Sequence, residues 1–402
     1  MADLSLECIG LKFKNPFLIA SGQHTTSMGL IRKNAGEIAN AGWAGLVTKT
    51  FVLEGHPLST LPITHIFPIS GLRRSNMQNI GPSQPILSQS VLREDVKAAK
   101  DAGLIIIASV MGRTLDEWTV LARSVEECGA DAVELSIGCP VILDARDISA
   151  GVISHSPDLV NKVVRAAKKE CSAPIIPKVT PNLREGDLPI VTKAAENAGA
   201  DAISAINTVL GLAGIDIETG IPLSSDIYGK SIISGISGPI VKPIGLQCVS
   251  QIAKAVDIPV FGIGGISDYK SAIEYMMVGA SVVQLCTAVM FRGYQIGRDL
   301  TKGLSEFMKR KGYKSLDDFR GISLPNIITN HLKMNLKTKV SAFVNEQKCT
   351  GCGLCVTACS DGATNAITME DKIAVVNKDV CIGCGLCRVI CLVNAIDLAA
   401  LT

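Results

Sequence analysis

The sequence has 402 residues, of which 47% are hydrophobic and 4% aromatic, and its formal net charge is +2. Because the charges nearly balance and no long run carries one sign, neither nucleic acid nor an anionic membrane is expected as the main partner. The N-terminus lacks a basic segment followed by an apolar one, and no apolar run reaches about 18 residues. We therefore predict a cytoplasmic protein without a secretory signal or a membrane span.

A repeated pattern runs from the N-terminus to about residue 290. Each repeat has a short apolar run, a turn and an amphipathic helical segment, and phrases such as Cys128-Gly-Ala-Asp131 carry a glycine typical of helix ends. Eight such repeats favour a parallel sheet that closes into a (β/α)8 TIM barrel, of class α/β, with an open doubly wound sheet as the alternative. The predicted strands lie near Phe17–Ser21, Gly45–Thr50, Ile105–Val110, Ala132–Ser136, Ile175–Val179, Ala202–Ile206, Val260–Gly264 and Ser281–Leu285.

Two connections are too long to be plain turns, one from Phe51 to Pro85 and one from Asn207 to Pro243. Both follow a predicted strand, so both belong to the C-terminal face of the barrel, where such barrels hold their active sites. Long connections in compact domains are usually functional. We expect these two to take part in the site.

The domain boundaries follow from where the strand pattern stops. Residues 1–312 are predicted to form the barrel, and residues 313–340 a helical linker that ends in the basic stretch Lys333–Lys339. We interpret those lysines as solvated. Residues 341–402 then form a second, small α+β domain.

Eight of the 14 cysteines fall in that last segment, in the spacing C-x2-C-x2-C-x3-C, which occurs twice. The neighbouring residues repeat as well, so the segment is an internal duplication. No export signal supports a disulfide framework, and the crowding indicates metal ligands. The two sets are Cys349, Cys352, Cys355 and Cys359, and then Cys381, Cys384, Cys387 and Cys391.

This spacing suits two [4Fe–4S] clusters whose ligands interleave. Three thiolates of one tight loop bind three corners of a cluster, and the fourth ligand comes from the other half. The segment closely resembles bacterial two-cluster ferredoxins, although Ser360 and Leu392 stand where those proteins have proline. Two structural zinc sites are the alternative. We assign Cys349, Cys352, Cys355 and Cys391 to one cluster, and Cys381, Cys384, Cys387 and Cys359 to the other.

The ends of the predicted barrel strands carry further recognisable phrases. Gly262-Ile-Gly-Gly265 and Leu285-Cys-Thr-Ala288 follow the seventh and eighth strands, where barrels often bind a phosphate. A glycine-rich strand end alone can also be plain packing. The other phrases are Ala20-Ser21-Gly22, Val47-Thr-Lys-Thr50, Gly138-Cys-Pro140, Pro177-Lys-Val-Thr-Pro-Asn182, Ile206-Asn-Thr208, Ser234-Gly-Ile-Ser-Gly238 and Lys242-Pro243.

Taken in order, these phrases resemble the dihydroorotate and dihydropyrimidine dehydrogenases. The likeness is strongest to the iron–sulfur and FMN subunits of bacterial NAD-dependent dihydropyrimidine dehydrogenases, and it covers nearly the whole chain. It implies FMN on the barrel, with its phosphate near Gly264, Gly265 and Thr287, and with Lys49 and Lys178 against the flavin ring. The implied FMN residues are Ala20, Ser21, Gly22, Lys49, Thr50, Lys178, Asn207, Gly235, Gly238, Gly264, Gly265, Cys286 and Thr287.

The same resemblance makes Cys139 the catalytic residue, which exchanges a proton with a substrate ring carbon while FMN exchanges a hydride with the neighbouring carbon. A thiol titrates close enough to neutrality to serve as acid or base. A buried structural cysteine is the alternative. The implied substrate residues are Asn76, Asn79, Ser136, Asn207 and Thr208, because amides and hydroxyls complement a pyrimidine's polar edges.

The chain departs from the family's pattern where the substrate is recognised. Ser136 and Gly138 replace the Asn and Ser that precede the catalytic cysteine in relatives, and Arg113 stands where an asparagine is often found. Arg113 either meets an acidic substrate or is a solvated loop residue. The substrate is therefore uracil or thymine, another cyclic or conjugated ene, or dihydroorotate.

The expected activity is the reduction or formation of a ring C=C bond, with electrons that pass through the clusters and FMN. Since no second dinucleotide-binding motif follows a strand, oxidation of NAD(P)H calls for a separate FAD-binding partner subunit, and we expect an oligomer. Two other classes of protein are alternatives: an electron-transfer subunit whose barrel is structural, and a redox sensor.

Overall fold

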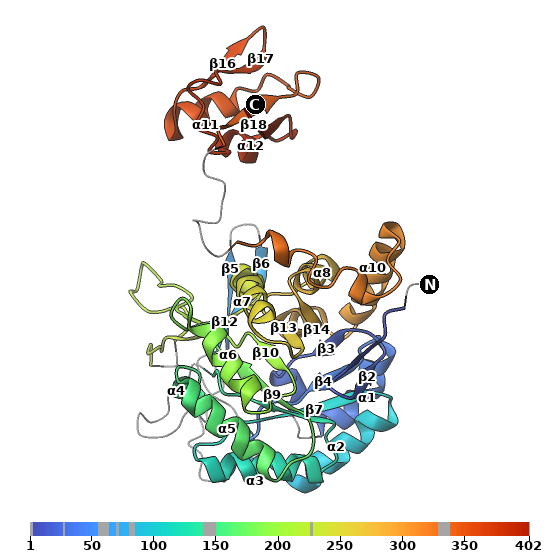
Figure 1. Ribbon diagram of the computed structural model, residues 1–402. Coiled ribbons are helices and arrows are strands. Elements are labelled where there is room, and N and C mark those ends of the chain that lie inside the picture. The colour runs from blue at the N-terminus through green and yellow to red at the C-terminus, as the bar shows by residue number, and fades with distance from the viewer. Residues whose placement is uncertain are drawn as a thin grey trace. The chain divides into compact units, whose positions relative to one another are not determined.

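The computed structural model describes residues 3–26, 29–54, 64–69, 72–79, 85–139, 150–225, 228–328 and 338–401 (Figure 1). The chain divides into two compact units, Met1–Asn326 and Ile327–Thr402. The first unit extends beyond residue 312, because Tyr313 stacks on Phe319 and the fully buried Phe319 packs edge-on against Phe307. In the predicted linker, the described residues form two short 3-10 turns, η3 (Leu316–Asp318) and η4 (Leu324–Asn326), and not a long helix.

The first unit is built on a closed barrel of eight parallel strands, as predicted. Parallel pairing of Val283 with Phe17 and of Leu285 with Ile19 joins the last strand to the first, which excludes the open sheet. The strand interiors are buried, as expected when helices cover the barrel. Around the barrel the strands are β3 (Phe17–Ile19), β4 (Gly45–Val47), β7 (Ile105–Val110), β8 (Ala132–Leu135), β9 (Ile175–Val179), β10 (Ile203–Ala205), β13 (Val260–Ile263) and β14 (Ala280–Leu285).

The helices that surround the barrel include several that begin at a side-chain cap. The Thr114 side chain accepts a hydrogen bond from the Glu117 N–H, and Ser156 accepts one from the Leu159 N–H just before a helix with Pro157 at its first position. These helices are α1 (Leu30–Asn40), α2 (Gln89–Asp101), α3 (Leu115–Glu127), α4 (Ala150–Ile153), α5 (Pro157–Lys169), α6 (Asp187–Asn197), α7 (Lys242–Ala255), α8 (Tyr269–Met277), α9 (Thr287–Arg292) and α10 (Ile296–Lys311). No helix within the described ranges is both long and apolar enough to cross a membrane.

A short N-terminal hairpin, β1 (Leu6–Cys8) and β2 (Leu11–Phe13), belongs to the apolar core inside the barrel. Phe13 packs edge-on against Phe261 of β13, with ring centroids 6.2 Å apart. The cluster also includes Leu18 and Val47 from β3 and β4. The sequence pattern did not reveal this hairpin.

The two long connections pair with each other to form one antiparallel sheet. Its strands are β5 (Thr64–Ile69) and β6 (Leu72–Asn79) from the first connection, and β11 (Val209–Gly211) and β12 (Ser234–Ser237) from the second, in the order β11-β12-β6-β5. The fully buried Gln78 fastens them, because its side-chain amide donates to the Gly211 carbonyl at 2.8 Å and accepts from the Ala213 N–H at 2.7 Å. The loop η2 (Pro239–Val241) then leads into α7.

The second unit repeats a simple motif, as the duplicated sequence predicts. Strand β15 (Val340–Val344) pairs antiparallel with β18 (Ile396–Ala400), and β16 (Ile367–Glu370) pairs with β17 (Ile373–Val376). Helices α11 (Leu354–Gly362) and α12 (Leu386–Ile390) each begin inside one cysteine motif. The core is small, so bound cofactors have a large share in holding such a unit together.

Candidate functional site

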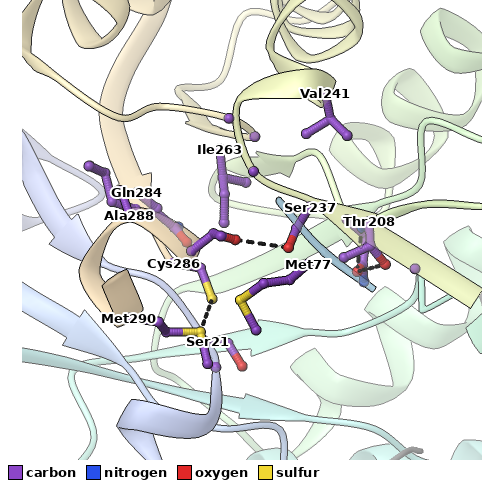
Figure 2. A pocket seen from close by; sticks show the side chains of 18 of the residues that line it. Ser21, Met77, Thr208, Ser237, Val241, Ile263, Gln284, Cys286, Ala288 and Met290 are labelled. Carbon is purple, nitrogen blue, oxygen red and sulfur yellow. Dashed lines mark hydrogen bonds between the residues drawn. The ribbon is translucent and has the colours of Figure 1, made fainter. Parts of the chain in front are cut away.

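A cavity of about 630 Å³ lies at the carboxyl ends of the barrel strands, with the sheet formed by the two long connections as one wall (Figure 2). It gathers residues that are far apart in the sequence. The predicted residues that line it are Ser21, Gly22, Lys49, Thr50, Ser136, Cys139, Lys178, Asn207, Thr208, Gly235, Gly238, Gly264, Gly265, Cys286 and Thr287.

Two predicted residues lie elsewhere. Ala20 is fully buried, and its N–H donates to the Leu285 carbonyl at 2.8 Å, so it joins β3 to β14. Asn76 is also fully buried, and its side-chain oxygen accepts from the Ile240 N–H at 3.1 Å. Because side chains alternate along β6, the residue that reaches the cavity is the neighbouring Met77. The Asn79 side chain lies outside the described residues.

Arg113 does not line the cavity either. Its guanidinium forms an ion pair with Glu117 at 3.1 Å, and its N–H donates to the same carboxylate at 2.7 Å. Both interactions lie at the start of α3. The structure therefore gives Arg113 a helix-end role and provides no support for its contact with an acidic substrate.

The backbone just after β12, β13 and β14 encloses one end of the cavity, and we call this part the glycine cradle. Gly265 has φ +72°, and a Cβ there would lie 2.6 Å from the Lys242 nitrogen and 2.9 Å from the Gly238 oxygen, so only glycine fits. The Ser237 and Thr287 hydroxyls are 2.8 Å apart across this end, as the dashed line at Ser237 in Figure 2 shows. Backbone N–H groups and side-chain hydroxyls that lie close together in this way can bind an anion.

Two lysines line the cavity in different surroundings. Lys178 is buried, with its ammonium 3.4 Å from a carboxylate oxygen of Glu134. Lys49 is half-buried, and within the described ranges its ammonium has no hydrogen-bond or carboxylate partner. Burial lowers the pKa of Lys49, and the positive charge of Lys178 adds to this effect, whereas the Cys139 and Cys286 thiols oppose it. The cavity thus holds one paired and one unpaired amine.

Gln284 is a cavity residue that the sequence analysis missed. It is 1% exposed, and in the described part of the chain neither polar atom of its amide has a hydrogen-bond partner. Leaving such a group without a partner costs about 1–3 kcal/mol, so an amide in this position indicates a ligand with donors and acceptors. Gln284 lies in a strand of mostly apolar residues near Cys286 and Ile263 in Figure 2. A polar residue in a buried strand was the signal available.

His24 lies beside this cavity without lining it. Both ring nitrogens are buried and have no partner among the described residues. Burial, with a smaller contribution from the Lys49 charge, lowers the pKa of His24 to about 4. The ring is therefore neutral at physiological pH.

Cys139 lines the cavity and is half-buried. It follows Gly138, where a Cβ would lie 2.5 Å from the Thr180 nitrogen and 2.6 Å from the Val179 carbonyl carbon. A serine at position 138 therefore does not fit this chain without a backbone shift. A second thiol, Cys286, lies 4.0 Å from the Met290 sulfur on the cavity wall (Figure 2). Burial raises the pKa of Cys286.

The second unit contains two small cavities, each lined by four cysteines. Gly351 and Gly383 take the same left-handed conformation in the two motifs, and a Cβ on either would lie within 3 Å of a carbonyl oxygen. The fourth cysteine of each motif accepts a backbone N–H, from Ala366 to Cys359 at 3.3 Å and from Ala395 to Cys391 at 3.2 Å. One cavity is lined by Cys349, Cys352, Cys355 and Cys391, and the other by Cys381, Cys384, Cys387 and Cys359.

Two protein-family models match the chain, one described as dihydroorotate dehydrogenase over residues 3–308 and one described as a 4Fe-4S dicluster domain over residues 342–398. The NAD-dependent dihydropyrimidine dehydrogenase subunit PreA of Escherichia coli strain K12 is 34% identical over 379 residues, which are 92% of this chain and 88% of that protein. The dihydroorotate dehydrogenase B (NAD(+)) catalytic subunit of Pyrococcus abyssi is 36% identical over 321 residues, 80% of this chain and 99% of that subunit. The same subunit of Methanothermobacter thermautotrophicus is 33% identical over 320 residues, 80% of this chain and 98% of that subunit. The latter two relatives leave about a fifth of this chain without a counterpart.

Proposed function

Because the chain belongs to the dihydroorotate dehydrogenase family, we propose that it reduces the ring C=C bond of uracil or thymine to the 5,6-dihydropyrimidine. Membership makes it an oxidoreductase that acts on CH–CH groups, with FMN as the barrel cofactor and two [4Fe–4S] clusters in the C-terminal unit. One observation carries the proposal: a single cavity contains Cys139, both lysines and the glycine cradle.

The residues of the cradle fit the phosphate of FMN. Gly264 and Gly265 both have positive φ, and at Gly265 the backbone approaches Gly238 too closely for any side chain. The Thr287 hydroxyl, paired with that of Ser237, can donate to a phosphate oxygen. The unpaired amide of Gln284 gives the same cavity a further donor and acceptor for the cofactor.

The ring of FMN would lie against the two lysines. Bound FMN supplies hydride chemistry, and its reduced form carries a negative charge that a nearby cation stabilises. Lys49 and Lys178 both line the cavity, and an ammonium from either would provide such a cation beside the ring. Ser21, Gly22 and Thr50 line the cavity at the ends of β3 and β4, where they can contact the ring edge.

Cys139 is proposed as the acid that completes the reduction. The substrate double bond takes a hydride at one carbon and a proton at the other, and the thiol of Cys139 gives that proton and later regains one from solvent. Its half-buried position allows both events.

Ser136, Asn207 and Thr208 are proposed to bind the polar edges of the substrate. Asn207 is held in a defined orientation because its side-chain oxygen accepts the Thr208 N–H at 2.8 Å. Its amide nitrogen has no partner among the described residues, so it is available to donate to a carbonyl. Asn76 is left out of this set, since its oxygen already holds Ile240.

The C-terminal unit is proposed to carry electrons between the barrel cofactor and a partner. The four-cysteine lining of each cavity supports one cluster on Cys349, Cys352, Cys355 and Cys391, and the other on Cys381, Cys384, Cys387 and Cys359. The Escherichia coli relative is itself named as a subunit. We propose that an FAD-binding partner subunit oxidises NAD(P)H and passes electrons to the clusters. The oligomeric state and the cytoplasmic location stay predictions.

Dihydroorotate oxidation is the second candidate. It is favoured by the catalytic subunits of dihydroorotate dehydrogenase B, which this chain matches at similar identity. The pyrimidine reduction is preferred because the Escherichia coli relative is matched over 92% of this chain, the cluster unit included.

The deciding experiment follows the flavin. The chain is purified without oxygen and reduced chemically, and its flavin absorbance is recorded while uracil, thymine, orotate or another cyclic ene is added. Fast reoxidation by uracil or thymine, lost in Cys139→Ala and kept in the control Cys171→Ala, supports the proposal; Cys171 is buried outside the cavity. Silence toward both pyrimidines with a response to orotate or another ene overturns the assigned substrate, and a preparation without flavin overturns the proposed function itself.

A further inference from the structure

Glu134 is a buried carboxylate that the proposed chemistry does not use. It lies in β8, is 1% exposed and lines the cavity. Its Oε1 accepts from the Ser109 hydroxyl at 3.2 Å and lies 3.4 Å from the Lys178 ammonium, and its Oε2 accepts from the Ser204 hydroxyl at 3.2 Å. The donors come from three strands, β7, β9 and β10.

This arrangement differs from an ordinary surface ion pair. A carboxylate buried in an apolar strand is costly unless donors surround it, and here both oxygens have them. The low dielectric of the barrel interior also makes its attraction for a nearby ammonium strong. The hydroxyls of Ser109 and Ser204 are themselves fully buried, so neither can turn to solvent and release Glu134.

The pairing sets the two cavity lysines apart. Lys178 has Glu134 within ion-pair distance, whereas Lys49 has no carboxylate partner among the described residues. Two ammonium groups in one cavity repel each other, and an anion beside one of them offsets that repulsion. Glu134 therefore decides which of the two ammonium groups is fixed in position.

We propose that Glu134 is a positioning residue that holds the Lys178 ammonium in place against the flavin. The inference rests on the proposed function, because it takes the cavity to be the FMN site. Glu134 acts through Lys178 and touches neither substrate nor reacting atoms in this role. A glutamine keeps its size and an acceptor oxygen for Lys178, but it removes the negative charge that attracts the ammonium.

The test is a double-mutant cycle in which the FMN midpoint potential is measured on the full chain. Lys178→Met removes the cation and shifts the potential to a more negative value. Glu134→Gln shifts it in the same direction, because without its partner the ammonium is no longer held beside the ring. In the Lys178→Met background the sign reverses: Glu134→Gln then removes only a negative charge and shifts the potential to a more positive value.

The control is Glu126→Gln. Glu126 also accepts several hydrogen bonds, from Ser172 and Ala173, but on α3 outside the cavity, and its replacement leaves the potential unchanged. Melting curves and flavin-to-protein ratios show whether each variant folds and binds FMN. If Glu134→Gln does not fold or does not bind FMN, Glu134→Leu is measured in its place. A positive shift in both backgrounds, or no shift in wild-type background, overturns the proposal. A wild-type chain that binds no FMN instead overturns the proposed function.

Discussion

The Gln78 side-chain oxygen accepts a hydrogen bond from the Ser224 hydroxyl at 2.7 Å, although the two residues are 146 positions apart. The same oxygen accepts the Ala213 N–H, and the amide nitrogen donates to Gly211. One fully buried side chain thus fastens two long connections over the cavity.

Gln78→Ala is expected to destabilise this sheet. Removing the amide leaves the Ala213 N–H without its acceptor, which costs about 1–3 kcal/mol, and leaves the buried Ser224 hydroxyl only the Ser231 hydroxyl at 3.2 Å as a partner. The melting temperature should fall by several degrees, and FMN should bind more weakly. Calorimetry checks this, with the exposed Gln247→Ala as control. An unchanged melting temperature would show that the sheet does not depend on Gln78.

Cys139→Ala should lower the rate at which substrate reoxidises the reduced flavin by about 10²- to 10⁴-fold, the usual contribution of a general acid. FMN content and substrate affinity should change little, because the thiol is proposed to move a proton and not to hold either molecule. Stopped-flow absorbance measures the rate. The reoxidation rate of Cys139→Ser, whose hydroxyl is a less acidic proton donor, should lie between those of wild type and Cys139→Ala.

Gly265→Ala should weaken FMN binding about tenfold or more, because the new Cβ would meet the Lys242 nitrogen at 2.6 Å and widen the cradle. Gly312→Ala is the matched control. Gly312 has a similar φ of +75° but no atom within 4 Å of the added Cβ, so it carries only the conformational strain of about 1–2 kcal/mol. Fluorescence titration of the apoprotein with FMN gives both affinities. Equal affinities in the two variants would contradict the cradle.

His24 should make the protein less stable in mild acid. Its pKa is about 4 in the folded chain and 6.5 when exposed, so the unfolded state binds the proton more readily. Stability from this residue is complete above pH 6.5 and is lost as the pH falls toward 4, by up to about 3 kcal/mol. Denaturant titrations at pH 7, 6 and 5 should show a shallower decline for His24→Leu than for wild type. The exposed His155→Gln should follow wild type.

The crossed cluster ligands predict an unusual pattern in double variants. Cys359→Ser and Cys384→Ser should damage the same cluster, so the double variant keeps roughly half of the iron. Cys359→Ser with Cys352→Ser should damage both clusters and lose nearly all of it, because Cys352 lines the other cavity. Iron analysis and electron paramagnetic resonance of the reduced proteins distinguish the double variant that has lost one cluster from the one that has lost both. The opposite pattern would mean that each motif binds its own cluster.

The sequence alone determined the barrel and the cluster unit, because both depend on local, repeated patterns. Eight apolar runs at regular intervals indicate strands whichever strands they pair with. The doubled cysteine spacing indicates its cofactor because the thiolates of one short loop can all reach the same cluster. The strand-end phrases indicated Lys49, Lys178 and Cys139 through their resemblance to the dihydroorotate and dihydropyrimidine dehydrogenases, and every parallel strand of a barrel delivers its carboxyl end to one face.

The tertiary structure decided what depends on pairing between distant segments. The register of β6 turns Asn76 away from the cavity and Met77 toward it, and a shift of one residue would reverse this. The pairing of the two long connections, through Gln78, gives the cavity its wall. Glu134 acquires its role only because three neighbouring strands bring Ser109, Lys178 and Ser204 to it inside the closed barrel. No local pattern encodes such contacts, since each partner comes from a different strand and only the pairing of consecutive strands brings them within hydrogen-bond distance.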